Sequence, residues 1–231
     1  MSDRATTYQD KAGAFAAVKK KTKDNTPPVD WLFYENAAAA NGCKLICGVD
    51  EAGRGPLAGA VFAAAVILPP NTIIEGVNDS KKLSEKNRER LFDIICEKAL
   101  AYSVASVSEA VIDEINILQA TYRAMSQAVS GLSVVPDFVL IDGNKIPPRI
   151  DIPAEAVVGG DAKSASIACA SILAKVSRDR YMLSLAERYP QYCFERHKGY
   201  GTKLHIEKLR EFGVSEIHRR SFLTKIEGVQ L

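Results

Sequence analysis

The stretch CGVDEAGRGPLAG, residues 47–59, is the most informative part of this sequence. Apolar residues lead into it, and a second apolar run, residues 61–68, follows it. This layout predicts a strand over residues 44–50, a charged glycine-rich turn, and a second strand over residues 58–68. Because the connection between the two strands is short, we expect them to be antiparallel neighbours in one sheet.

The turn carries groups that suit phosphate chemistry. Asp50 and Glu51 supply hard oxygen ligands of the kind that Mg²⁺ and Mn²⁺ prefer. Gly53 and Gly55 allow unusual backbone dihedral angles and the close approach of another molecule, while Arg54 can bind a phosphate group. The alternative is a solvated hairpin turn in which two acidic residues are adjacent by chance.

The rest of the chain alternates predicted strands with predicted helices. Apolar runs predict strands over residues 101–107, 137–142 and 155–158. Periodic apolar stripes predict helices over residues 84–100, 108–132 and 164–188, the last with small residues that allow close approach to the sheet. This order predicts an α/β fold with a mixed five-stranded sheet flanked by helices, in which three antiparallel strands precede parallel strands after a crossover helix.

The sequence divides into three parts. Residues 1–43 form an N-terminal helical extension, with one helix at about residues 8–20, a solvated lysine run, and a short helix that Asp30 caps. Residues 44–190 form the main α/β domain. Residues 191–231 form a small C-terminal helical segment whose helix starts after Thr202 and ends at Gly213.

Composition limits the class of protein. Of 231 residues, 47% are hydrophobic, which is enough for one substantial core. The net charge is only +2, so a nucleic-acid surface must come from local basic clusters. Five cysteines without a C-x-x-C pair argue against zinc and disulfides and indicate reduced thiols. The sequence has neither a signal-peptide layout nor a membrane-length apolar run, so we expect a cytoplasmic protein with no membrane partner.

Two further acids lie at predicted element ends. Asp142 ends an apolar strand and Asp161 precedes a helix, where the ordinary roles are a turn residue and a helix cap. Together with Asp50 and Glu51 they make four carboxylates, which would repel one another unless cations bind. Consecutive strand residues point to opposite faces, so Asp50 and Glu51 can share a cation site only if the strand ends or twists between them. Two divalent ions in such a site can clamp the attacking and leaving oxygens of a phosphoryl displacement.

A series of ordered motifs identifies a family. They are GVDEAGRGP at 48–56, DSKKL at 79–83, IDG at 141–143, GDAKS at 160–164, ASILAKVSRD at 170–179, HKGYGT at 197–202 and HRRSF at 218–222. In these motifs the chain resembles bacterial ribonuclease HII, the type 2 ribonuclease H, from about residue 44 to residue 222.

The resemblance implies a ribonuclease H-like fold, with residues 44–190 as the catalytic domain and residues 191–231 as a substrate-binding segment. It implies cleavage of RNA in RNA–DNA hybrids, and cleavage 5′ of single ribonucleotides in duplex DNA during ribonucleotide excision repair and DNA replication. Two ions, Mg²⁺ or Mn²⁺, would direct water to the phosphorus and leave 5′-phosphate and 3′-hydroxyl ends. The implied catalytic and metal-binding residues are Asp50, Glu51, Asp142 and Asp161.

The resemblance also implies how substrate is recognised. Main-chain groups of Gly53, Arg54 and Gly55 would sense the 2′-hydroxyl, which distinguishes RNA from DNA. Tyr200, between two glycines, would pack on the sugar beyond the RNA–DNA junction; the alternative is a loop tyrosine packed on the core.

Several basic residues are candidate phosphate contacts, which would position the duplex without reading its sequence. They are Lys81, Lys82, Arg196, His197 and Lys198, and the alternative for each is a solvated surface charge. Asp179 also belongs to a family motif, and we expect it to pair with Arg178 or Arg180 instead of binding metal.

Two other functions remain open. One is a DNA-cutting nuclease or transposase on the same fold, and the other is an inactive module that binds hybrids. We expect a monomer. The tail, residues 223–231, lacks the glutamine, spaced apolar and paired aromatic residues of a sliding-clamp motif, so contact with a clamp stays open.

Overall fold

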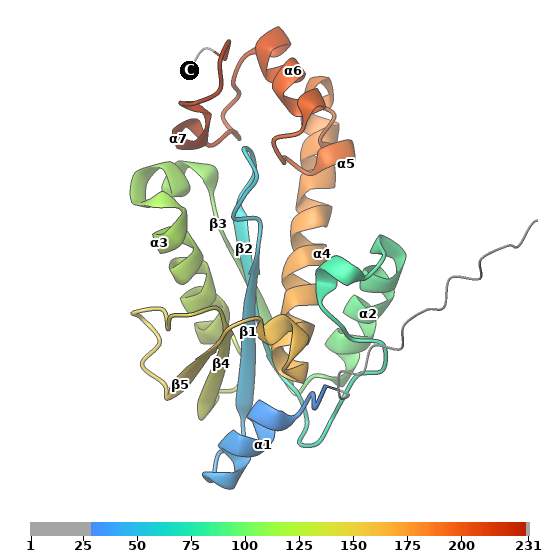
Figure 1. Cartoon of the computed structure of the whole chain (residues 1–231), viewed down its shortest axis with the longest axis vertical. Coiled ribbons are helices and arrows are strands. Elements are labelled where there is room, and N and C mark those ends of the chain that lie inside the picture. The colour runs from blue at the N-terminus through green and yellow to red at the C-terminus, as the bar shows by residue number, and fades with distance from the viewer. Residues whose placement is uncertain (1–28, 230–231) are drawn as a thin grey trace, which may run out of the picture.

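The structure, a computed structural model, describes residues 29–229 of the chain. A five-stranded sheet in the order β3-β2-β1-β4-β5 lies at its centre (Figure 1). The strands are β1 (Ile46–Ala52), β2 (Val61–Ile67), β3 (Ala101–Val107), β4 (Phe138–Asp142) and β5 (Ala154–Val157). The α-helices are α1 (Phe33–Ala40), α2 (Glu85–Lys98), α3 (Glu109–Ser130), α4 (Ala165–Arg188), α5 (Phe194–His197), α6 (Lys203–Phe212) and α7 (Arg220–Leu223). Short 3₁₀ helices are η1 (Ser80–Lys82), η2 (Gly160–Ala162) and η3 (Pro190–Tyr192).

The strand pairing confirms the predicted mixed sheet. β1 pairs with β2 and β2 with β3 in antiparallel fashion, whereas β4 pairs with β1 and β5 with β4 in parallel. The prediction that the first strand ends at Asp50 is wrong. β1 continues to Ala52, and both Asp50 and Glu51 stay paired with β2, opposite Ala64 and Ala63.

Helices cover both faces of the sheet, with α3 on one side and α4 and α2 on the other (Figure 1). In β2, Ala63 and Ala65 pack with the residues of α3, while Ala64 and Val66 pack with those of α4 and α2. The small residues of α4 bring it against β1, as predicted. A Cβ atom on Gly48 would lie 2.1 Å from the carbonyl carbon of Ser166, so only glycine fits there.

The long helix α3 is interrupted, contrary to the continuous helix that its apolar stripe predicts. Asn116 has φ 65° and ψ 163°, which are not helical angles. Its Oδ1 accepts hydrogen bonds from the backbone nitrogens of Leu118 at 3.0 Å and Gln119 at 3.2 Å. Asn116 therefore caps the second half of the helix, as asparagine does at helix N-termini.

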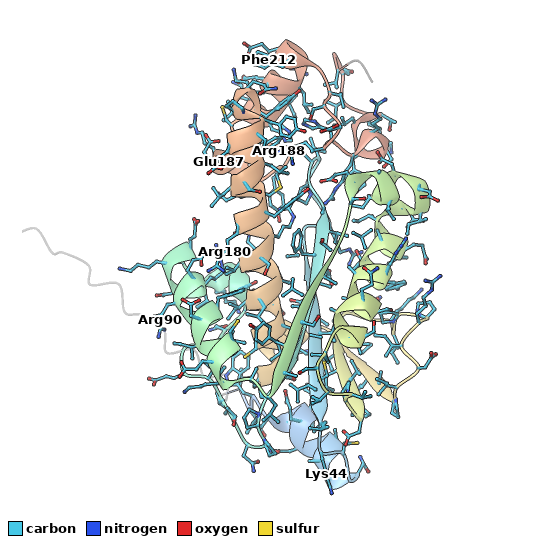
Figure 2. The ribbon with its side chains drawn as sticks, turned by 180° about the vertical axis from the view of Figure 1, so that it is seen from behind. Lys44, Arg90, Arg180, Glu187, Arg188 and Phe212 are labelled. Atoms are coloured by element: carbon cyan, nitrogen blue, oxygen red, sulfur yellow. The ribbon has the colours of Figure 1, made fainter. Side chains whose placement is uncertain are left out.

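The C-terminal segment packs on the end of α4 and on the β1–β2 turn (Figure 1). Its apolar cluster joins Tyr192, Phe194 and Leu209 to Met182 of α4 and to Ala58 of the turn. Lys44, at the start of β1, and Phe212, at the end of α6, mark opposite ends of the molecule (Figure 2). The helix expected at residues 8–20 lies outside the described residues. Over residues 29–229, no helix is long and apolar enough to span a bilayer.

Candidate active site

Asp142 ends β4, and Asp50 lies near the carboxyl end of the adjacent parallel strand β1. The register of β1 and β4 pairs Val49 with Ile141, and each aspartate is the next residue of its strand. Val49 and Ile141 belong to the core on the α3 face. Because strand side chains alternate between faces, both aspartates point to the α4 face.

Asp161 reaches the same place from η2, the turn before α4. The Oδ1 atom of Asp142 accepts a hydrogen bond from the backbone nitrogen of Gly160 at 2.7 Å, which ties the end of β4 to this turn. Lys81, from η1, joins the group with its Nζ 3.0 Å from Asp161 Oδ2. A residue that the sequence suggests as a phosphate contact thus pairs with one of the acids.

Glu51 points to the opposite face from Asp50, as strand alternation requires. It lines a small cleft beside α3 together with Arg54, Asp142 and Lys145. The Nη1 atom of Arg54 lies 3.4 Å from Glu51 Oε1. Because Asp142 borders this cleft too, Glu51 and Asp142 influence each other's charge around the end of the sheet.

The acids strongly affect one another's protonation. Burial, followed by the charges of Glu51 and Asp142, raises the pKa of Asp50 well above its usual range. Burial also raises the pKa of Glu51, although Arg54 opposes this shift. Burial and then the charge of Asp161 raise the pKa of Asp142. Nearby positive groups therefore do not fully compensate the negative charge of these acids.

The chemistry of this cluster fits divalent cations. Carboxylate oxygens are the donors that Mg²⁺ and Mn²⁺ prefer, and close like charges favour a bound cation. Burial disfavours the charge on Lys81, but its hydrogen bond to Asp161 prevails and raises its pKa. Within residues 29–229, no set of three or more His, Cys, Asp or Glu side chains stands ready to hold a metal ion. Binding of one ion by several of these acids thus needs their side chains to turn toward it.

Two serines lie near Asp50 on the α4 side. The hydroxyl of Ser171 of α4 opposes, to a small extent, the effect of burial on the pKa of Asp50, and its Oγ lies 2.9 Å from the Oγ of Ser80. Both serines lie within the quoted motifs, but the sequence gives no sign that they meet.

Arg219 holds the glycine turn from inside the protein. Its side chain is fully buried and donates to the backbone oxygens of Gly53 at 2.7 Å, Arg54 at 3.0 Å and Gly59 at 2.6 Å. Burial, and then the nearby charge of Arg178, lowers the pKa of Arg219 to about 9. Because this buried cation binds only carbonyls, it points the carbonyls of the turn toward the protein interior. The opposite side of the turn is not occupied by these contacts.

Arg178 of α4 lies near Arg219 and also binds backbone carbonyls. It donates to the backbone oxygens of Ala60 at 3.2 Å, Ala58 at 3.1 Å and Lys198 at 3.1 Å. Gly53 has φ 95°, and a Cβ atom there would lie 2.0 Å from the Nε of Arg178. The turn can therefore sit on the guanidinium group only because residue 53 is glycine. Neither arginine is predicted from the sequence to shape the turn, although they belong to the motifs ASILAKVSRD at 170–179 and HRRSF at 218–222.

Tyr200 lies next to this turn with 43% of its surface exposed. The guanidinium carbon of Arg178 is 5.8 Å from the centre of its ring. The preceding residue, Gly199, accepts a hydrogen bond from the backbone nitrogen of Leu57 at 2.8 Å. The loop of Tyr200 and the glycine turn thus form one continuous surface.

The other candidate phosphate contacts differ in accessibility. Arg196 and Lys82 are exposed, and the Nζ of Lys82 lies 3.9 Å from Asp79. The Nζ of Lys198 donates to the backbone oxygen of Glu195 at 2.6 Å. His197 is buried, with its Nε2 2.9 Å from the backbone oxygen of Tyr192. A buried imidazole that is already bonded cannot make the predicted phosphate contact.

The prediction for Asp179 is wrong in its partners. Its Oδ1 accepts from the Nζ of Lys175 at 2.6 Å, and its Oδ2 lies 3.8 Å from Arg88. Arg178 points to the glycine turn instead, and Arg180 pairs with Glu89.

The short helix α1 is hydrogen-bonded to the start of α4. The Oε1 atom of Glu35 accepts hydrogen bonds from Ser164 Oγ at 2.6 Å, Ser166 Oγ at 2.7 Å and the backbone nitrogen of Ser166 at 3.0 Å. The backbone nitrogen of Ala165 donates to the oxygen of Trp31 at 2.9 Å. This part of the N-terminal extension, to which the sequence assigns no role, thus fixes the helix that follows Asp161.

Comparison with known proteins points to one family. The family model described as Ribonuclease HII matches residues 47–225. A ribonuclease HII from Caldicellulosiruptor bescii is 60% identical over 197 residues, which cover 85% of this chain and 95% of that relative.

Solved structures agree with this result. The ribonuclease H2 of Pyrococcus horikoshii OT3 superposes with a TM-score of 0.66 at 28% identity, covering 76% of this chain and 92% of that one. The RNase HII from Archaeoglobus fulgidus, solved in a complex with PCNA, has a TM-score of 0.62 at 26% identity, covering 76% of this chain and 94% of that one.

Proposed function

Because the chain belongs to the ribonuclease HII family, we propose that it hydrolyses the RNA strand of RNA–DNA hybrids and cuts duplex DNA 5′ of a single embedded ribonucleotide. The ends left would be a 5′-phosphate and a 3′-hydroxyl, and the cellular role would be ribonucleotide excision repair and DNA replication. One observation carries the proposal: Asp50 and Asp142 lie near the carboxyl ends of neighbouring parallel strands, with Asp161 tied to them through Gly160.

Asp50, Glu51, Asp142 and Asp161 are proposed as the catalytic and metal-binding residues, with Mg²⁺ or Mn²⁺ as the ion. Two such ions, when bound, supply an activated water and stabilise the leaving 3′-oxygen. The chain itself contributes a rigid frame, because Ser171 lies beside Asp50 and Gly160 holds Asp142. Lys81 neutralises Asp161 and lies 77% exposed at the site, where a substrate phosphate could replace the carboxylate as its partner.

The glycine turn is proposed to recognise the ribose. Arg178 and Arg219 draw the carbonyls of the turn inward, and Arg54 and Gly55 are exposed beside the buried Gly53. Main-chain groups of Gly53, Arg54 and Gly55 would meet the 2′-hydroxyl, which both donates and accepts. Tyr200, on the same surface, would pack on the sugar beyond the junction. Lys82, Arg196 and Lys198 would contact phosphates of the duplex.

The test is digestion of a duplex that carries one ribonucleotide, first with Mg²⁺ and then with Mn²⁺, beside a long hybrid and an all-DNA duplex. We expect cleavage of the first two substrates, single-ribonucleotide cleavage on the 5′ side, and no cut in all-DNA. Cleavage of all-DNA at a similar rate would favour the DNA-nuclease alternative. Binding of hybrid without any cleavage would favour the inactive module.

The protein is proposed to act as a monomer and to need no clamp for cleavage. Light scattering with and without duplex tests the first point. Addition of a bacterial sliding clamp to the digestion tests the second, and a rate that depends on the clamp would contradict it.

A further inference from the structure

The three histidines of this chain all lie in the C-terminal segment, between residues 197 and 218, and their side chains gather in its interior. His197, His205 and His218 are 7%, 0% and 2% exposed. The rings of His197 and His205 stack with centres 4.5 Å apart, and those of His205 and His218 lie 5.3 Å apart. Phe194 packs against all three rings. None of the three belongs to the acidic cluster, so the proposed cleavage leaves them without a role.

Hydrogen bonds fix which nitrogen of His205 carries its proton. The Nδ1 of His205 lies 3.0 Å from the backbone oxygen of Tyr200. A carbonyl can only accept, so Nδ1 carries the proton and, in the neutral ring, Nε2 is an acceptor.

The opposite arrangement holds in His218. Its Nδ1 lies 3.1 Å from the backbone nitrogen of Ser215 and 2.7 Å from the Oγ of the same residue. A backbone N–H can only donate, so Nδ1 is the acceptor and Nε2 carries the proton. That proton points to the Nε2 of His205 at 3.1 Å. The donors therefore run in one direction, from Ser215 through His218 and His205 to Tyr200.

The surroundings keep these rings neutral. Burial, and then a neighbouring histidine, lowers the pKa of His205 to about 4 and that of His218 to about 3. A proton added to the Nε2 of His205 would face the N–H of His218, and a proton added to the Nδ1 of His218 would face the N–H of Ser215. In each case two donors would meet and the hydrogen bond between those two groups would break. His197 fits the same pattern, because its Nε2 faces the oxygen of Tyr192 and its Nδ1 accepts from the nitrogen of Gly199 at 3.3 Å.

We infer that His218 and His205 form a relay of fixed tautomers that positions Tyr200 for the substrate. The backbone of Tyr200 is held on both sides: its nitrogen donates to the oxygen of His197 at 2.9 Å, and its oxygen accepts from His205 and from the nitrogen of Thr202 at 2.8 Å. The ring itself is exposed, so its direction depends on this backbone. The inference rests on the proposed function, in which Tyr200 packs on the sugar beyond the RNA–DNA junction.

The first test reads the tautomers directly and needs no activity. Long-range ¹H–¹⁵N spectra of the full-length protein at pH 7 should show His205 protonated on Nδ1, and His197 and His218 protonated on Nε2. A His205 ring protonated on Nε2, or a charged His205 or His218, would overturn the relay. This result stands even if the protein cleaves neither ribonucleotide substrate, so failure of the proposed function and failure of the relay are distinguishable.

The second test measures kcat/KM on the single-ribonucleotide duplex relative to a long hybrid. His205→Leu removes both hydrogen bonds of the ring and should lower this ratio about five- to tenfold, the effect of one or two net hydrogen bonds. His205→Asn, whose amide can still donate to Tyr200, should recover part of the ratio. In a Tyr200→Ala background, His205→Leu should not lower the ratio further, because the two residues act on one contact.

A packing control separates positioning from stability. Leu209→Ala removes a side chain from the same buried cluster but leaves the relay intact, so it should lower the unfolding temperature and leave the substrate ratio unchanged. Equal losses on both substrates in His205→Leu, or the same shift of the ratio in Leu209→Ala, would contradict the inference. If His205→Leu does not fold, His205→Asn and the spectra still decide it.

Discussion

The Nη2 of Arg219 donates to the backbone oxygen of Gly53 at 2.7 Å, across more than 160 residues of sequence. Through this contact the C-terminal segment shapes the turn that follows the acidic pair. Arg219 binds carbonyls where a buried arginine ordinarily binds a carboxylate. Loss of its side chain would therefore release the turn without leaving an unpaired acid.

Arg219→Lys should preserve the charge but lose most of the hydrogen bonds, because an ammonium group cannot reach several carbonyls as a planar guanidinium does. We expect the free energy of unfolding to fall by about 1.5–3 kcal/mol, the cost of losing buried hydrogen bonds to a charged group. Urea unfolding measures this. Arg196→Lys, at an exposed position, is the matched control and should change stability by less than about 0.5 kcal/mol. Similar small losses in both variants would contradict the role of Arg219.

Asp50→Asn should make the protein more stable in the absence of divalent ions. Burial and neighbouring acids raise the pKa of Asp50, so its charge opposes folding at neutral pH, and the neutral amide relieves that cost. Cleavage should fall by at least about a thousandfold, on the scale of losing a group that stabilises transition-state charge. Thermal unfolding in EDTA measures the gain in stability, and in Mn²⁺ it should show that the variant loses the stabilisation that the ion gives. Digestion of the single-ribonucleotide duplex measures the loss of cleavage. A variant that cleaves normally would remove Asp50 from the catalytic group.

Lys81→Met should tighten the binding of Mn²⁺. The Nζ of Lys81 lies 3.0 Å from Asp161 and competes with a cation for that carboxylate. Because the lysine is largely exposed, the gain should be only about two- to fivefold, as expected for a solvated ion pair. Titration calorimetry with Mn²⁺ measures it, and Lys82→Met is the control. Weaker binding in Lys81→Met than in Lys82→Met would show that Lys81 does not compete with the ion.

Glu35→Ala should destabilise the start of α4. It removes an acceptor that serves Ser164 and Ser166, and the loss of buried hydrogen bonds to a charged group costs about 1.5–3 kcal/mol. Glu187→Ala, an exposed acid near the other end of α4 (Figure 2), is the control and should have little effect. Urea unfolding compares the two. If Glu35→Ala costs no more than Glu187→Ala, α1 does not anchor α4.

The stability of the protein should fall as the pH drops below about 6.5, the ordinary pKa of an unfolded histidine. His205 and His218 have folded-state pKa values of about 4 and about 3, so unfolding takes up protons between those values and 6.5. Each ring contributes a slope that grows from about half of 1.4 kcal/mol per pH unit at pH 6.5 toward the full value about one unit lower. Urea unfolding between pH 6.5 and 5.5, above most carboxyl titrations, should give a smaller slope for His218→Asn than for the original chain. An unchanged slope would exclude a neutral buried His218.

The sheet was predictable because its information is local. Apolar runs and their connections specify the strands, and short or helical connections specify antiparallel or parallel pairing. The extension of β1 to Ala52 depends on pairing with β2, which a glycine-rich sequence does not reveal. The interruption at Asn116 was missed because the apolar stripe continues across it and only the backbone angles change.

Asp142 and Asp161 could be proposed from the sequence because each lies at an element end, and Asp50 and Glu51 because they stand between an apolar strand and a glycine-rich turn. Their arrangement was not, since Glu51 points to the other face and Lys81 pairs with Asp161 only through distant packing. The buried Arg178, Arg219 and histidines escaped prediction for another reason. Arginine is ordinarily exposed, and no spacing in the sequence indicates that Arg178 and Arg219 bind carbonyls more than a hundred positions away. No motif spacing indicates that the three histidines meet.

Because Gly48 has no side chain, the backbone of α4 can pack directly against β1. Any larger residue there would lift the helix, and Ser171 would move away from Asp50 with it. A library randomised at position 48 and selected for ribonuclease activity should therefore return glycine almost alone, and alanine should impair catalysis from a position that never meets the substrate. The absence of a Cβ atom at residue 48 therefore controls the distance between α4 and β1, and with it the arrangement of the acidic cluster.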